Sequence, residues 1–389
     1  MIKLKLYFST TILFCLTAPA QTPALPAPYA TPSATNPPKL VAKPDGKQLT
    51  VPDGFSVTEY ASGLSKPRIM LEVAPGTVLV SDSVAKGSVF ALTNGGKDKK
   101  ALIKDLDRPF SMAVYKGFLY VTEAESLKRY PFDAKKLTVG PGQEVVSLKG
   151  YNKGHWTRSL AFDAKANKMY LGVGSGSNVD TGDPANRAAI NVYNPDGSGH
   201  EIFASGLRNP VSMHWNPVTK KLWSTCQERD GLGDDLVPDF FTEIKQGAFY
   251  GWPYAYIGQN EEPRHKGEAP DMVKKSIVPD VVLPAHVSSM DFAFYTGKQF
   301  PSKYKNGVFL AERGSGNRAQ RIGYQIVFIP FKDGKPAGAP EPFLGGFMMG
   351  SGEREVWGRP VGVSQLADGS LLVSEDGNNK IWHISYKKM

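Results

Sequence analysis

Two short segments carry the residue types best suited to chemistry. The first places His155 directly before Trp156, and a neutral imidazole near pH 7 is a suitable general base. The second places Arg208 ahead of an acidic, glycine-rich run at residues 228–235. Carbonyl and carboxylate oxygens in such a turn can converge on a hard cation such as calcium. The alternatives are a structural histidine bonded to a neighbouring strand and a solvated loop held by Asx turns.

The elements that must position these residues recur along the chain. Short alternating or apolar segments are separated by Gly, Asp or Asn turns, and helical periodicity is almost absent. Six such units follow one another at spacings of roughly 40 to 80 residues. This pattern predicts an all-β fold, a six-bladed β-propeller. The wider spacing late in the chain predicts long inserted loops in the fourth and fifth blades, notably residues 231–251 and 258–278.

The repeat also predicts where charge collects. Residues at the same step of every repeat lie at the same radius and height, and the step before the innermost strand opens onto the central channel. That step is occupied by arginine or histidine in each unit: Arg68, Arg108, Arg158, Arg208, His286 and Arg359. Guanidinium groups favour bidentate carboxylate or phosphate partners, so the ring predicts a bound polyanion. The alternative is a ring neutralised by the protein's own carboxylates.

With these residues assembled, the chain resembles the soluble pyrroloquinoline-quinone (PQQ) sugar dehydrogenases, most closely their sorbosone and aldose dehydrogenase-like branch. The resemblance extends from about residue 52 to residue 386. Its most specific motifs are GHWTRSLAF (154–162), SGLRNP (205–210), ERDGLGDD (228–235), GAFYGWP (247–253) and GRP (358–360). It implies a six-bladed propeller with PQQ and calcium at the channel mouth. The implied activity is oxidation of an aldose or sorbosone-type sugar at the hemiacetal or aldehyde carbon.

The resemblance also implies roles for single residues. His155 matches the base that takes the proton of the anomeric hydroxyl, although glucose-oxidising relatives have a slightly different histidine-to-arginine spacing. Arg208 matches the arginine that polarises the quinone carbonyl, and Asn209 matches its cofactor-binding neighbour. Asp230 and Gly231 match the two residues whose carbonyls ligate calcium, where the family has Gly-Pro. The other expected cofactor contacts are Arg158, Arg359 and either or both of Arg313 and Arg318.

The N-terminus predicts export. Residues 1–20 combine two early lysines, an apolar run and a final Ala-Pro-Ala, which is typical of a cleaved signal peptide. Residues 21–43 are rich in Pro, Ala and Thr and predict an extended linker, with order beginning near Val51. Residues 44–389 are then one catalytic propeller domain. We expect a periplasmic or secreted protein in which Cys226 remains as the only cysteine, so no internal disulfide forms.

Several other features exclude or leave open further functions. Apart from the leader, no run of about eighteen apolar residues occurs, so no transmembrane segment is expected. The net charge is +9, but the basic residues are dispersed and no nucleic-acid-binding signature is present, so no nucleic-acid partner is expected. The glycine-rich run 172–178 lacks a following helix and predicts a turn where backbones approach closely, not a nucleotide site.

The sequence contains no haem attachment motif, so a dehydrogenase would need an external electron acceptor, a quinone or a cytochrome. Two other functions remain open. A calcium-dependent propeller lactonase would need carboxylates at the channel mouth in place of arginines. A non-catalytic propeller would bind a protein or cell-wall partner and tolerate the loss of His155.

Overall fold

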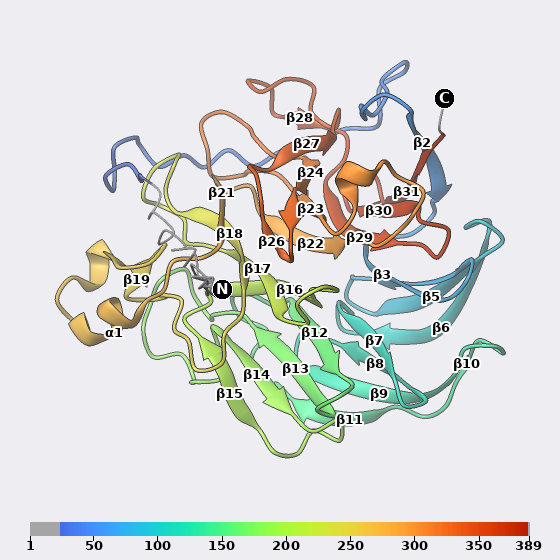
Figure 1. The fold of residues 1–389 in the computed structure, drawn as a ribbon, viewed down its shortest axis with the longest axis horizontal. Coiled ribbons are helices and arrows are strands. Elements are labelled where there is room, and N and C mark those ends of the chain that lie inside the picture. The colour runs from blue at the N-terminus through green and yellow to red at the C-terminus, as the bar shows by residue number, and fades with distance from the viewer. Residues whose placement is uncertain (1–23, 388–389) are drawn as a thin grey trace, which may run out of the picture.

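The computed structural model describes residues 24–387, and six antiparallel sheets are arranged in a ring around a common axis (Figure 1). The predicted all-β, six-bladed propeller is therefore confirmed. The first three blades follow the chain outward from the channel. They are β3 (Pro67–Ala74), β4 (Thr77–Asp82), β5 (Gly87–Thr93) and β6 (Asp98–Leu106); β7 (Met112–Tyr115), β8 (Phe118–Thr122) and β9 (Ser126–Asp133), with β10 (Thr138–Val139) and β11 (Gln143–Ser147) both paired to β9; and β12 (Arg158–Asp163), β13 (Lys168–Val173), β14 (Ala189–Tyr193) and β15 (Glu201–Ser205).

The last three blades keep the same order, and the sixth takes its outermost strand from the N-terminal part of the chain. They are β16 (Asn209–Trp215), β17 (Leu222–Gln227), β18 (Pro238–Glu243) and β21 (Val281–Ala285); β22 (Ser289–Phe294), β23 (Val308–Glu312), β24 (Gln325–Ile329) and β27 (Glu341–Leu344); and β29 (Pro360–Gln365), β30 (Leu371–Glu375), β31 (Lys380–Tyr386) and β2 (Phe55–Ala61). The innermost strands are thus β3, β7, β12, β16, β22 and β29.

Blade strands are apolar on both faces because each blade is covered by its two neighbours. Val78, Leu79 and Val80 of β4 are all fully buried, and they belong to clusters on opposite faces of that sheet. Between the fourth and fifth blades, Trp223 and Phe241 pack in one cluster with residues of β22 and β23. Such strands read as continuous apolar runs, which is why the repeat is visible in the sequence.

The predicted insertions both fall in the fourth blade, so the assignment of one to the fifth blade was wrong. Residues 258–278 lie in the excursion between β18 and β21, which contains β19 (Ala255–Tyr256), β20 (Asn260–Glu261) and α1 (Pro270–Lys275). Residues 231–251 are only partly a loop, because they include β18. Phe240 and Phe241 of that strand fill the blade interior, and flanking glycine and proline residues had obscured it. The fifth blade instead carries a small hairpin, β25 (Phe331–Lys332) and β26 (Lys335–Pro336).

The segment expected to be a linker is extended, as its composition indicates, but it is bonded to the propeller. Ordered chain is described from residue 24, well before Val51, and β1 (Lys39–Leu40) pairs in parallel with β28 (Glu355–Val356). The predicted signal peptide lies outside the described residues. No helix among residues 24–387 is long and apolar enough to span a membrane.

The ring of blades is closed by pairing of β2 with β31, in which Phe55 lies opposite Tyr386. The Phe55 ring contacts an aromatic cluster that links the sixth blade to the fifth. Its centroid lies 4.7 Å from that of Phe300, 5.0 Å from Phe343 and 4.9 Å from Tyr386. This pairing places strands from the two ends of the chain in one blade and so fastens the first blade to the last.

We predict that Phe55→Ala lowers the free energy of unfolding by about 2–4 kcal/mol, because it leaves a cavity at the closure. Urea unfolding followed by tryptophan fluorescence measures the change. Val114→Ala, at an exposed site on β7, serves as the control and should change stability by less than about 0.5 kcal/mol. Equal stability of the two variants would show that the closure does not depend on this ring.

Candidate functional site

Two adjoining cavities open at the channel mouth, where the innermost strands begin. They measure about 220 and 260 Å³ and share His155, Gln227 and Ser288 as lining residues. The first is also lined by Arg68, Trp156, Thr157, Asn209 and Arg313, and the second by Arg208, Glu228, Asp230, Asp239, His286, Asn317 and Arg359. Residues far apart in the sequence, mostly charged or polar, therefore converge on one mouth.

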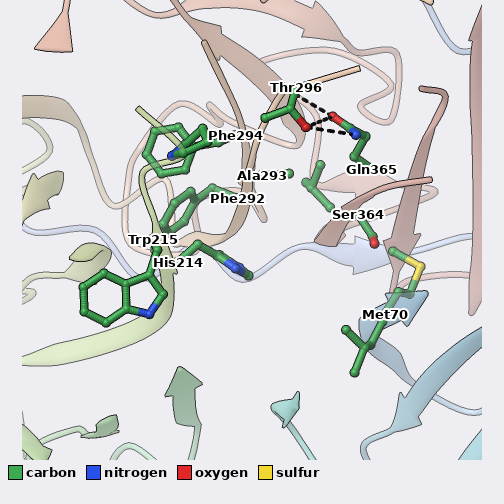
Figure 2. Close-up of a pocket in the computed structure, with 12 residues that line it drawn as sticks. Met70, His214, Trp215, Phe292, Ala293, Phe294, Thr296, Ser364 and Gln365 are labelled. Atoms are coloured by element: carbon green, nitrogen blue, oxygen red, sulfur yellow. Dashed lines mark hydrogen bonds between the residues drawn. The ribbon is translucent and has the colours of Figure 1, made fainter. Parts of the chain in front are cut away.

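A cavity of about 360 Å³ at the other ends of these strands has a different character (Figure 2). Its walls include Phe292, Phe294 and Trp215, and Gln365 is hydrogen-bonded to Thr296 at one side. No arginine or lysine lines this cavity. It does not suit a polyanion, so the candidate site is at the arginine-rich mouth.

His155 is held so that one ring nitrogen remains available. Its Nδ1 lies 3.0 Å from both the carbonyl oxygen and the hydroxyl oxygen of Ser175, whose hydroxyl donates to the Ser177 carbonyl at 2.6 Å. Nδ1 must therefore carry the proton and donate it, which leaves Nε2 as a bare acceptor. No hydrogen bond from the described residues occupies Nε2. The ring is thus the tautomer that a general base at the mouth requires.

The pKa of His155 is lowered to about 3. Burial is the main cause, and the charges of Arg208 and Arg187 act in the same direction. The imidazole is consequently neutral at every pH at which the protein would work.

The glycine-rich run 172–178 makes this placement possible, as the prediction of close backbone approach required. A Cβ atom on Gly174 would lie 2.5 Å from Cβ of His155 and 2.6 Å from Oδ1 of Asn209. Gly154 has a φ of +72°, and a Cβ there would meet the carbonyl oxygen of Gly176 at 2.4 Å. The prediction is confirmed: these glycines let His155 and Asn209 lie side by side.

A chain of hydrogen bonds between side chains connects the third, fourth and fifth blades beneath the two cavities. Thr157 donates to Oδ1 of Asn209 at 3.3 Å, and Nδ2 of Asn209 donates to Oε1 of Gln227 at 3.0 Å. Nε2 of Gln227 then donates to the Ser288 hydroxyl at 3.0 Å. Asn209 thus lies at the mouth, as predicted, and Gln227 is a lining residue that the sequence did not reveal.

Arg208 lies at the second cavity, and Asn178 fixes its guanidinium group. Nε donates to the Asn178 carbonyl at 2.9 Å, NH2 donates to Oδ1 of Asn178 at 2.8 Å, and NH1 donates to the Glu228 carbonyl at 2.8 Å. Asn178 also accepts from the backbone of Asp230 at 3.0 Å and donates to its carbonyl at 2.9 Å. Asn178 therefore connects Arg208 to the acidic loop, and its position in a glycine-serine turn gave no signal of this role.

The acidic loop brings Asp230 to the same cavity. Its Oδ1 lies 3.0 Å from Nδ1 of His286, and its Oδ2 lies 3.8 Å from Arg208. Burial opposes ionisation of Asp230, yet the hydrogen bond from His286 and the charge of Arg208 hold its pKa below the usual value. His286 also contacts the Gly233 carbonyl at 2.9 Å, so this histidine supports the loop.

Two further carboxyl groups line this cavity: Glu228, which belongs to the acidic run but was given no role of its own, and Asp239, which was not singled out from the sequence. Burial raises the pKa of Glu228 to about 8 and that of Asp239 to about 6. Asp239 accepts from the backbone amides of Glu228 at 3.0 Å and Ser289 at 2.7 Å. The blade-four side of the mouth therefore holds three carboxyl groups, those of Glu228, Asp230 and Asp239, together with Arg208 and His286.

The opposite side of the mouth has more cations than anions. Buried Asp376 binds Arg68 at 2.6 Å and Arg313 at 3.0 Å. Arg359 reaches only the carbonyls of Arg313 at 3.4 Å and Gly314 at 3.3 Å. No carboxylate among residues 24–387 lies within ion-pair distance of Arg359. Three guanidinium groups therefore share a single carboxylate.

Arg158 and Arg108, which the repeat also placed at the channel mouth, lie apart from these three arginines. The fully buried guanidinium of Arg158 donates to the carbonyls of Tyr151, His155 and Thr157 and does not line either cavity. Its predicted cofactor contact is not supported, because its side chain turns into the blade and supports the His155 backbone. Arg108 pairs with Asp107 at 3.0 Å and lies over the ring of Trp156, 5.4 Å from its centroid, but it does not itself line either cavity.

Arg313 and Arg318 are also distinguished by their positions. Arg313 lines the first cavity. Arg318 pairs with Asp235 at 2.8 Å and donates to the Asp234 carbonyl, outside the two cavities. Arg313 is therefore the better placed of these two predicted cofactor contacts.

The sequence matches that of a known protein family. The sequence model of the TrAA12-like family matches residues 49–238 and 257–387, which is most of the chain. The chain belongs to the TrAA12-like family. The predicted relationship to the PQQ-dependent sugar dehydrogenases is confirmed at this level.

Relatives of this TrAA12-like protein include a protein of Borreliella burgdorferi described as uncharacterized, 29% identical over 88% of this chain and 92% of that one. Two solved structures share the fold. The calcium structure of the AA12 enzyme of Trichoderma reesei has a TM-score of 0.74 at 21% identity, covering 95% of this chain and 100% of that one. The holo PQQ domain of pyranose dehydrogenase from Coprinopsis cinerea has a TM-score of 0.75 at 21% identity, covering 88% and 98%.

The arginines of this TrAA12-like protein fit the polycarboxylate cofactor that the resemblance implies, whereas side chains alone do not form the implied calcium site within residues 24–387. A polycarboxylate would balance the surplus charge of Arg68, Arg313 and Arg359. No group of three or more His, Cys, Asp or Glu side chains within residues 24–387 is arranged to hold a metal ion. A calcium ion would therefore need backbone carbonyls, as predicted for Asp230 and Gly231, beside the buried acidic side chains of this cavity.

We predict that Asp376→Asn destabilises the protein by roughly 3–5 kcal/mol, because it leaves the guanidinium groups of Arg68 and Arg313 without their counter-charge. Burial opposes ionisation of Asp376, but the two arginines lower its pKa to about 2, below the ordinary value of 3.8. Its stabilising effect is therefore complete above about pH 4 and is lost as the pH falls through about 2.

Thermal and urea unfolding at pH 7 and at pH 3 measure this effect. The difference between wild type and Asp376→Asn should shrink at the lower pH. Asp98→Asn, at an exposed site, is the control. A wild-type stability equal to that of Asp376→Asn at pH 7 would contradict the prediction.

Proposed function

We propose that this protein is an exported, calcium- and PQQ-dependent dehydrogenase. It oxidises an aldose or a sorbosone-type sugar at the hemiacetal or aldehyde carbon. One observation carries the proposal: a neutral imidazole with a bare Nε2 shares a mouth with three arginines that have one carboxylate between them. The choice of ligands is supported by two proteins of the same fold, the holo PQQ domain from Coprinopsis cinerea and the calcium structure of the Trichoderma reesei enzyme.

Bound PQQ would supply an ortho-quinone that accepts hydride from the sugar carbon. The protein's own contribution to this step is the removal of a proton. Nε2 of His155 accepts the proton of the reacting hydroxyl, while Ser175 holds Nδ1–H and keeps the ring oriented. The resulting imidazolium is positively charged, and the charge of Asp230 acts to stabilise it.

The arginines would orient the cofactor and stabilise developing negative charge. Carboxylates of the cofactor would be bound by Arg68, Arg313 and Arg359. The hydrogen bonds of Asn209 hold the neighbouring cavity wall in one arrangement. Arg208 is held rigidly by Asn178, so its charge acts on the mouth without a cost of reorganisation. The carbonyls of Asp230 and Gly231 would contribute to the calcium site.

The electrons must leave for an external acceptor, a quinone or cytochrome, because oxidation of a sugar to a lactone or acid releases two electrons. The proposed location, periplasmic or secreted, rests on the signal-peptide pattern of residues 1–20. No nucleic-acid partner is proposed.

Reconstitution with PQQ and calcium tests the function directly. We expect dye reduction with at least one sugar in a panel of aldoses and sorbosone, and loss of activity when calcium is chelated by EGTA. His155→Gln should lower kcat by 10²- to 10⁴-fold, because the general base is removed. The change in PQQ absorbance on binding should persist in this variant.

His214→Gln is the matched control, because His214 lies in the cavity at the other end of the channel. It should retain wild-type rates. Full activity in His155→Gln would exclude His155 as the base, and absence of PQQ binding by the wild type would exclude the proposed cofactor.

The pH dependence of kcat/KM gives a separate prediction. Because the pKa of His155 is about 3, its imidazole should not gain a proton between pH 8 and pH 5. Asp239 and Glu228 line the same cavity with pKa values of about 6 and 8, so we expect any inflection of kcat/KM in this range to come from these carboxyl groups. The Cε1 proton resonance of His155, identified by its loss in His155→Gln, should show no titration near pH 6.5, and circular dichroism defines the pH range in which the protein stays folded. A titration of this resonance near pH 6.5 would show that the imidazole is far better solvated than its surroundings in the structure imply.

A further inference from the structure

We infer that residues 29–41, here named the N-terminal strap, hold in place the loops that line the cofactor site, and that Asn36 and Thr31 are the positioning residues for these loops. The inference rests on the proposed function as far as the cofactor is concerned. The strap comes from the segment whose composition predicts a linker. Its contacts are instead directed at the loops of the mouth.

Asn36 binds the loop of residues 313–324, which carries Arg313, Gly314, Gly316 and Asn317 to the cavities. Its backbone amide donates to the Gly316 carbonyl at 2.8 Å. Its Nδ2 donates to the carbonyls of Arg318 and Ala319 at 3.2 and 3.0 Å. Asn36 therefore bonds three backbone carbonyls of this loop, in addition to the bonds that the loop makes with Asp234 and Asp376.

Arg321 shows why the strap is needed. This guanidinium is almost completely buried, with 2% of the residue exposed. NH2 donates to Oδ1 of Asn36 at 2.8 Å, and NH1 donates to the Asn36 carbonyl at 3.0 Å. Its other acceptors are neutral as well, and no carboxylate among residues 24–387 pairs with it. Without the strap, a buried charge would lose two of its acceptors, which is strongly unfavourable.

Thr31 binds the other loop, residues 228–237, which carries Asp230 and Gly231. The amide of Asp234 donates to the Thr31 hydroxyl at 2.8 Å, and the amide of Tyr29 donates to the Leu232 carbonyl at 2.8 Å. A Cβ at Gly233 would lie 2.8 Å from the Thr31 carbonyl oxygen, so a glycine is needed where the strap crosses.

The end of the strap is fastened to the sixth blade. β1 pairs with β28, Lys39 bonds Glu355 at 3.0 Å, and Asn378 donates to the Val41 carbonyl at 3.1 Å. Asn378 follows Asp376 closely in the chain. The strap thus connects the acidic and the arginine-bearing sides of the mouth. Holding both before the ligand arrives reduces the ordering cost of binding.

The test uses the full chain with single substitutions. Asn36→Ala should weaken PQQ binding about tenfold in an absorbance titration, because the arginine-bearing loop is no longer held. Hydrogen exchange of the cofactor-free protein should become faster in residues 313–324. Thr31→Val keeps the side-chain shape and should speed exchange in residues 228–237. Thr35→Ala, an exposed neighbour in the strap, is the matched control and should change neither loop.

Unchanged exchange in both loops in Asn36→Ala and Thr31→Val would overturn the inference, and so would unchanged PQQ affinity despite faster exchange. If Asn36→Ala does not fold, Thr31→Val decides by the same two measurements. If the wild type binds no PQQ, the proposed function fails. The exchange experiment would then still show whether the strap holds the loops.

Discussion

The surplus of guanidinium charge over carboxylate at the channel mouth is the constraint on which the rest of the site depends. Asp376 can pair with Arg68 and Arg313 because they belong to the sixth, first and fifth blades and meet only when the propeller closes. Desolvated like charges repel, so such a group persists only where the surrounding packing leaves it no other position. The extensive apolar packing between blades provides that rigidity. A loose ring would let the arginines turn outward to water.

The residues around His155, the proposed general base, are held in place by different interactions. The third and fourth blades meet closely at Gly174. The hydrogen bonds of Asn209 with Thr157 and Gln227 hold the side chains that line the first cavity in one arrangement. The Ser175 carbonyl and hydroxyl then fix the tautomer of His155. Tight backbone packing and satisfied amide groups thus place an uncharged acceptor beside strongly charged neighbours without an ion pair that would protonate it.

The sequence was sufficient for the fold and for much of the site, because both depend on periodicity. Blade strands repeat as apolar runs, and the step before each innermost strand correctly placed Arg68, Arg208 and Arg359 at one mouth. Arg158 occupies the same step, yet its side chain finds three backbone carbonyls and stays inside the blade. Partners distant in sequence, such as Asp376 and Asn178, left no local pattern. The strap was hidden for a related reason: its extended, proline-rich composition is the same whether it is free or bonded.

The two sides of the mouth differ in charge: carboxyl groups lie on one side and unpaired arginine charge on the other. This arrangement favours the binding of a cation and of an anion, as the proposed function requires. Glu228 and Asp239 on the blade-four side have Arg208 and His286 beside them, whereas Arg359 lacks a carboxylate partner among residues 24–387. A cation bound beside the carboxyl groups would favour their ionised forms, and a polyanion would balance the arginines. Opposite charges bound in adjoining cavities attract each other, so we expect the affinities for calcium and PQQ to be coupled reciprocally. The strap bonds both loops, so a change in its contacts would alter the separation between the two ligands and with it the strength of their coupling.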